Sequence, residues 1–161
     1  MKKYLLNPAG MLIAGLILGI LIRLLDIYTT NLGNIFSQLA VWILLGTLIS
    51  IYSATPKAAM FHIFPFCMGM LLAYYAMAIV TNGVYHKIYI VGWMILALCS
   101  PLLGYLAWMA KRTDFLAKLI RVGIIFVSLL SSVILFDRLR IYDFMIAGLL
   151  IYFLFYKKID R

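Results

Sequence analysis

The strongest constraint on this chain is a regular alternation of long apolar runs with short polar breaks. About 20 apolar helical residues cross a bilayer core of about 30 Å. Six runs meet or approach that length, and breaks of about 3–7 residues separate them. The runs cover residues 9–28, 34–53, 58–80, 88–110, 116–136 and 140–156. They predict an all-α, polytopic membrane protein with six transmembrane helices.

The composition agrees with a lipid setting. The chain is 66% hydrophobic and 12% charged, whereas a soluble domain is about 45–50% apolar and about 25% charged. Nearly all of the 161 residues are needed for the helices, so we expect one helical-bundle domain over residues 1–161, with membrane lipids as its surroundings. Since short connections bring successive helices together, neighbouring helices should be antiparallel and in contact.

The basic residues predict an orientation. With the N-terminus inside, the inner breaks hold ten Lys and Arg residues and the outer breaks hold four. The inner ten are Lys2, Lys3, Lys57, Lys111, Arg112, Lys118, Arg121, Lys157, Lys158 and Arg161; the outer four are Arg23, Lys87, Arg138 and Arg140. Short loops rich in Lys and Arg stay in the cytoplasm, so both termini are expected inside the cell (inner or plasma) membrane. These charges form no continuous basic face, so nucleic acid is not an expected partner.

Several aromatic residues lie deeper than the usual interfacial belt. At 1.5 Å per residue, Trp42 lies about 12 Å from the outer end of its run, and Tyr74, Tyr75 and Trp93 lie about 8–9 Å in. Tyr and Trp normally sit at headgroup level, and a deep Tyr hydroxyl needs a partner. These four residues could therefore line an outer cavity that binds a small ligand. Ordinary packing between helices explains their depth equally well.

Ionisable residues collect at the same outer ends. Arg23 and Asp26 are three residues apart, so they share a helical face and can pair. Asp137, Arg140 and Asp143 repeat this spacing. We interpret Arg23, Asp26, Asp137 and Arg140 as candidate polar contacts to a ligand. The simpler alternative is that they are paired interfacial charges that close the loops.

The first run carries small residues at helical spacing: Gly10, Ala14, Gly15 and Gly19. Small-xxx-small faces let two helices approach closely. Packing within the chain is the favoured interpretation. The alternative is a contact with another membrane protein, which would make the chain an accessory or scaffold protein.

Sequence patterns of enzymes are absent. The chain has no Glu, its two His residues (His62 and His86) fall on opposite membrane sides, and no zinc, P-loop or nucleophile-elbow motif occurs. Cys67 and Cys99 lie inside apolar runs, where a cysteine is usually a small hydrophobe. We expect no catalytic residue, metal or cofactor, and an intramembrane enzyme is the least favoured hypothesis. His62, next to Pro65, is interpreted as an interfacial polar residue.

Part of the chain resembles a family of small, uncharacterised multipass membrane proteins from Gram-positive bacteria. The resemblance begins at Trp42-Ile43-Leu44-Leu45-Gly46, Tyr52-Ser53 and Pro56, and continues through Gly69-Met70-Leu71, Tyr74-Tyr75, Trp93, Ser100-Pro101 and Trp108. It covers roughly half of the chain. It implies a multipass membrane fold and no particular activity.

In architecture the chain also resembles the substrate-binding membrane subunits of energy-coupling-factor transporters. That resemblance implies a ligand pocket in the outer half and a partner subunit that contacts the first helix. The glycine-based face here departs from the alanine-based motif of those subunits. We therefore expect an integral membrane protein that binds a small ligand in an outward-facing pocket, as a transporter or transporter subunit.

Overall fold

The computed structural model describes residues 7–29, 35–36, 38–83 and 87–157, which form six α-helices and one terminal π-helical turn. The elements are α1 (Pro8–Tyr28), α3 (Leu39–Tyr52), α4 (Pro56–Val80), α5 (Lys87–Met109), α6 (Phe115–Phe136), α7 (Ile141–Ile151) and η1 (Tyr152–Tyr156). The expected all-α fold is confirmed. Among the described residues, α1, α4, α5 and α6 contain stretches long and apolar enough to cross a membrane.

Two helices are shorter than that. Helix α3 has 14 residues and begins at Leu39, whereas the sequence predicted a helix from residue 34, which lies outside the described residues. Helix α7 has 11 residues, and η1 extends it by five, to the predicted end at Tyr156. Four long apolar helices are thus shown, and two shorter ones accompany them.

Local sequence explains where helices α1 and α4 begin. Asn7 precedes Pro8, and Thr55 precedes Pro56; each polar side chain accepts a hydrogen bond from a backbone amide three residues later. Proline suits the first helical position because its missing N–H would have no helical partner there. Helices α4 and α5 continue through their internal prolines, Pro65 and Pro101.

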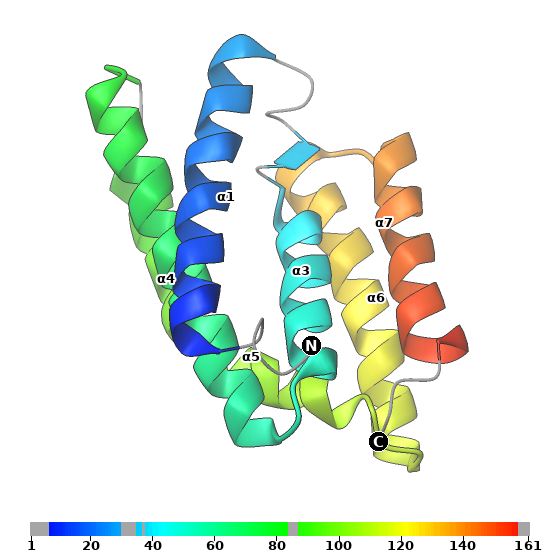
Figure 1. Ribbon diagram of the computed structural model, residues 1–161. Coiled ribbons are helices and arrows are strands. Elements are labelled where there is room, and N and C mark those ends of the chain that lie inside the picture. The colour runs from blue at the N-terminus through cyan, green and yellow to red at the C-terminus, as the bar shows by residue number, and fades with distance from the viewer. Residues whose placement is uncertain (1–6, 30–34, 37, 84–86, 158–161) are drawn as a thin grey trace.

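The helices form one bundle in which α3 is central, in contact with α4, α5, α6 and α7 (Figure 1). The expectation that sequence neighbours pack together is wrong for the first pair. Helix α1 packs along α4 rather than α3, and this is the most extensive helix–helix contact in the described chain. Small residues allow it: a Cβ at Gly69 would lie 2.7 Å from the Leu12 carbonyl oxygen.

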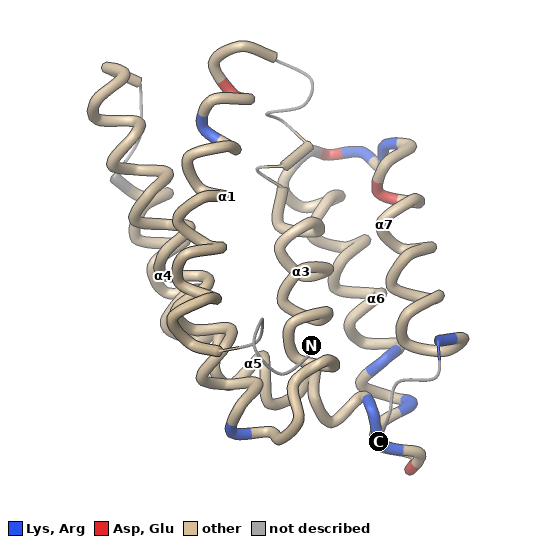
Figure 2. The backbone as a smooth tube through the Cα atoms, viewed as in Figure 1, with Lys and Arg blue, Asp and Glu red and all other residues tan. Residues whose placement is uncertain are grey.

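Charged residues lie at the two ends of the bundle and leave its middle apolar (Figure 2). The end we name the basic end carries Lys57, Lys111, Arg112, Lys118, Arg121 and Lys157, with Asp114. The opposite end, named the mixed-charge end, carries Arg23, Asp26, Asp137, Arg138, Arg140 and Asp143. Lys2, Lys3, Lys158 and Arg161, which contribute to the predicted orientation, lie outside the described residues.

Between these ends the outer surface is apolar. Large side chains such as Ile17 on α1, Leu102 on α5 and Phe126 on α6 are each more than 60% exposed. Water would solvate such a surface poorly, whereas lipid chains match it. This surface and the four long apolar helices are the features of a membrane protein.

Candidate ligand-binding site

A cavity of about 440 Å³ lies among helices α3, α4, α5 and α6. We call it the central cavity. Nearly all of its walls are aliphatic or aromatic side chains, and the polar groups that line it are uncharged ones, such as Thr47 and Ser100. The Ser100 hydroxyl already donates to the carbonyl of Ala97, at 2.7 Å. Apolar walls with few polar groups are usual for small-molecule sites.

Two of the four predicted aromatic residues form one wall of the central cavity. The indoles of Trp42 (α3) and Trp93 (α5) lie 5.2 Å apart between ring centroids, with a 31° angle between their planes. The Trp42 indole nitrogen is covered by neighbouring atoms and has no hydrogen-bond partner within the described residues. Trp42 and Trp93 thus lie together in the cavity wall, and both belong to the four aromatic residues predicted to line a pocket.

Glycines shape the cavity in two ways. At Gly46 an added Cβ would lie 3.0 Å from the Ile63 side chain, so this glycine lets α3 approach α4. At Gly123 on α6 an added Cβ would meet no atom within 4 Å. Since Gly123 lines the central cavity, its missing side chain leaves part of that space open.

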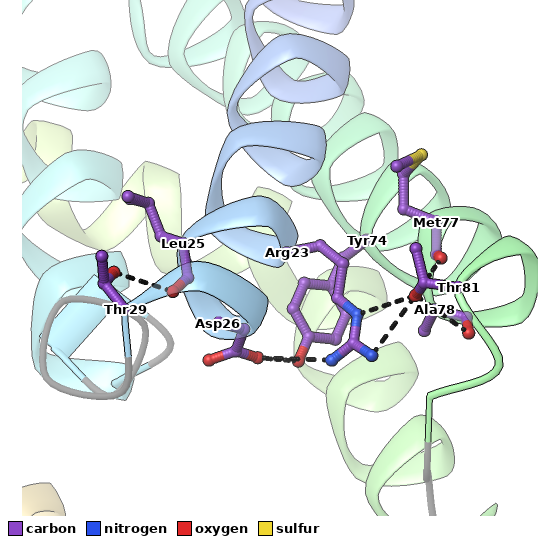
Figure 3. Close-up of polar contacts among 8 residues, drawn as sticks. All are labelled: Arg23, Leu25, Asp26, Thr29, Tyr74, Met77, Ala78 and Thr81. Atoms are coloured by element: carbon purple, nitrogen blue, oxygen red, sulfur yellow. Dashed lines mark hydrogen bonds and ion pairs between the residues drawn. The ribbon is translucent and has the colours of Figure 1, made fainter.

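Arg23, Asp26 and Tyr74 do not line the central cavity; they form a polar cluster between α1 and α4 (Figure 3). The Tyr74 hydroxyl donates to Asp26 Oδ2 at 2.6 Å, and the same oxygen lies 3.7 Å from Arg23 Nη1. Arg23 Nε and Nη2 both donate to the Thr81 hydroxyl at 3.4 Å. The predicted Arg23–Asp26 pair is present within α1, and the hydrogen bonds of these two residues to Thr81 and Tyr74 hold α1 to α4. Sequence analysis missed Thr81.

Tyr75 and Asp137 also lie away from the cavity lining. The Tyr75 ring packs edge-on against Tyr74, with centroids 5.3 Å apart. Asp137 ends α6 in a left-handed conformation, with φ of 54°, and is exposed. The residues that were predicted to form one outer pocket therefore lie in different sites in the structure.

Arg140 belongs to a buried polar cluster at the mixed-charge end, together with Asp143, Ser132, Gln38 and Tyr142. Asp143 is 2% exposed; it accepts from the Ser132 hydroxyl and from the backbone N–H of Arg140, both at 2.7 Å. With its amide oriented to satisfy both groups, Gln38 donates to Asp143 Oδ1 at 3.2 Å and accepts from Tyr142 at 2.9 Å. The cluster joins the start of α3 to α6 and α7. The three-residue spacing had included Asp143, and Gln38 had no sequence signal.

The small residues of the first helix pack within the chain. A Cβ at Gly15 would clash with the Phe66 carbonyl oxygen, and one at Gly19 with that of Met70. Both glycines are buried, whereas Gly10 and Ala14 are half-buried. A larger side chain at Gly15 would therefore separate α1 from α4.

Ser53 and His62 form a network at the basic end. The Ser53 hydroxyl lies 2.9 Å from His62 Nδ1, and its carbonyl oxygen accepts from Trp108 Nε1 at 3.1 Å and Lys111 Nζ at 3.0 Å. Partial burial lowers the pKa of Lys111. This network joins the α3–α4 turn to the end of α5, which gives His62 a structural role.

No group of three or more potential metal ligands occurs among the described residues. Comparisons with protein-family models, curated proteins and solved structures give no match for this chain.

Proposed function

We propose that the chain is a multipass protein of the cell membrane that binds a small, mostly apolar ligand in the central cavity. The observation that carries this proposal is the cavity itself. Its volume, about 440 Å³, falls within the range of about 300–1,000 Å³ that small-molecule sites occupy. The Trp42–Trp93 pair supplies a flat aromatic wall of the kind that packs well against an apolar molecule.

The proposed topology has six crossings with the basic end in the cytoplasm. Positive charge in short loops favours the cytoplasmic side, and Lys57, Lys111, Arg112 and Lys118 occupy turns or helix ends of the basic end. At 1.5 Å per residue, the 14 residues of α3 span about 21 Å. Because α3 is surrounded by other helices, it can be shorter than a helix that faces lipid along its whole length.

The lining defines the chemistry of the ligand. A charged or strongly polar molecule would lose its water on entry and find few groups to replace it, at a cost of several kcal/mol. An apolar molecule gains about 25 cal/mol for each Å² that it removes from water. We therefore expect the ligand to be largely apolar and uncharged. This narrows the chemical class of the small ligand that the sequence had suggested.

Gly123→Phe provides the test, with Gly92→Phe as its matched control. Phenylalanine at position 123 occupies the central cavity without a clash at Cβ. Gly92 lies on the exposed surface of α5, and an added Cβ there also meets no atom within 4 Å. Both changes replace a helical glycine, so their effects on helix stability should be similar, a gain of at most about 1 kcal/mol.

The measurement is quenching of tryptophan fluorescence by an uncharged brominated fatty alcohol, in the Trp108→Phe background. The chain has three tryptophans, so the remaining emission comes from Trp42 and Trp93. We expect saturable quenching that Gly123→Phe weakens at least tenfold and Gly92→Phe changes less than twofold. Equal quenching in both variants, with normal helical content, would contradict the proposal.

A further inference from the structure

The central cavity opens sideways, between α5 and α6. Leu103, Leu106 and Val127 belong to its lining and are also 45%, 41% and 51% exposed. Residues that line a cavity and are also exposed mark its opening, which we call the mouth. In a membrane-spanning bundle this mouth faces lipid chains, so a ligand enters from the bilayer.

Basic residues lie beyond the cavity wall, at the α5–α6 turn. Lys111 lies two residues past the end of α5, in the turn that joins α5 to α6, four positions after the lining residue Ala107. Arg121 follows the lining residue Ile120 and donates to the carbonyl oxygens of Ala110 and Arg112, both at 2.7 Å. Figure 2 shows the concentration of basic residues at this end.

Several cations of this turn can meet an anion. Arg112 and Lys118 are exposed; the one acidic residue of the turn, Asp114, lies 3.5 Å from Arg112 Nε. The Lys111 ammonium has three N–H donors, of which one is directed to the Ser53 carbonyl. Lysine and arginine are the usual partners of phosphate oxygens.

The height of the cavity suits a lipid chain. Trp93 and Ala107 mark the ends of its lining on α5, and 14 residues at 1.5 Å each correspond to about 21 Å. One leaflet contributes about 15 Å of a 30 Å hydrocarbon core. A chain of that length anchored at the basic end can therefore pass the mouth and occupy the part of the cavity nearer that end, below the Trp42–Trp93 pair.

We propose that the ligand of the central cavity is an anionic glycerophospholipid from the leaflet at the basic end. One acyl chain occupies the cavity, and the phosphate lies against Lys111, Arg112 and Lys118. This inference rests on the proposed function and adds the ligand class and its route of entry. The phosphate belongs to a membrane lipid and not to a soluble molecule.

The test measures quenching of Trp42 and Trp93, in the Trp108→Phe background, by phospholipids brominated on the acyl chain. Vesicles carry brominated phosphatidylglycerol or brominated phosphatidylcholine at equal mole fraction. The Arg112→Gln/Lys118→Gln variant is compared with Lys57→Gln, which removes an exposed cation from the α3–α4 turn of the same end. Each cation near a phosphate is expected to contribute about fivefold, so the double variant should lose about 25-fold in preference for the anionic lipid. Lys57→Gln should lose less than twofold.

The outcomes separate this inference from the proposed function. If phosphatidylcholine quenches as well as phosphatidylglycerol while Gly123→Phe still abolishes quenching, the anionic lipid is excluded and the apolar cavity stands. If Gly123→Phe changes nothing, both proposals fail. Soluble glycerol phosphate in excess should not relieve quenching, because it has no chain for the cavity; relief would show that a free phosphate is the preferred ligand and would overturn the lipid.

Discussion

Gly19→Leu is expected to destabilise the protein by about 3 kcal/mol or more. The side chain would have to occupy space held by the Met70 carbonyl oxygen, and an added Cβ would also lie 3.0 Å from that of Ala73. Overpacking a core typically costs about 1–3 kcal/mol, and a clash with backbone is harder to relieve than one with a flexible side chain. Helix α1 would therefore have to move away from α4 along their contact.

Gly148→Leu is the control for this prediction. It replaces an exposed glycine on α7 where an added Cβ meets no atom within 4 Å. We expect it to change the free energy of unfolding by at most about 1 kcal/mol, in the stabilising direction, because leucine favours helix more than glycine does. Unfolding of both variants in mixed micelles with increasing SDS measures the difference. Equal stability of the two would refute the close α1–α4 contact.

Asp143→Ala is expected to destabilise the protein by about 3–5 kcal/mol. The carboxylate accepts from Ser132 and from the Arg140 backbone, and it lies within reach of Gln38, which is 1% exposed. Removing this acceptor leaves the Ser132 hydroxyl and the Arg140 backbone N–H without the oxygens to which they donate, at a cost of about 1–3 kcal/mol for each. The loss of stability should be accompanied by separation of α3 from α6 and α7, because the hydrogen bonds of Asp143 join these helices.

Two further variants serve as comparisons for Asp143→Ala. Asp143→Asn keeps the shape and one acceptor oxygen, so an intermediate loss is expected. Asp137→Asn removes a carboxylate that is exposed and keeps a residue type that tolerates the left-handed conformation, so it should change stability by less than about 0.5 kcal/mol. SDS unfolding monitored by circular dichroism gives all three values. If Asp143→Ala matches Asp137→Asn, the buried cluster does not hold the bundle together.

The lengths of the apolar runs could predict the helices because they depend only on local sequence. The expected ends at Tyr28, Val80, Phe136 and Tyr156 match the described elements. Helix packing could not be predicted in the same way. Nothing in the first run shows that Gly15 and Gly19 meet backbone of α4 rather than α3, because a small-residue face fits any helix that comes close.

The site was predicted in part, for a similar reason. Depth along a helix follows from residue counting, and the structure brings Trp42 and Trp93, two of the four aromatic residues chosen in this way, into contact. The direction of a side chain depends on its neighbours. The Tyr74 hydroxyl needs a partner in an apolar setting and finds it in Asp26 on α1, away from the cavity lining.

The described polar residues at the two ends of the bundle thus join helices and do not line the central cavity. Arg23, Asp26, Arg140 and Asp143 join helices at the mixed-charge end, and Ser53 and Lys111 do so at the basic end. The space left between α3, α4, α5 and α6 is apolar. Ligand recognition in our account therefore depends on shape and apolar surface, with charge confined to the end of the cavity.

The most direct test of the central claim is an experimental map of the protein in lipid nanodiscs that contain phosphatidylglycerol. We expect elongated, non-protein density between α5 and α6 that extends past Leu106 into the central cavity. We also expect this density to be absent from a map of Gly123→Phe. A wild-type map in which side chains of α5 and α6 close together and fill this space would contradict the account.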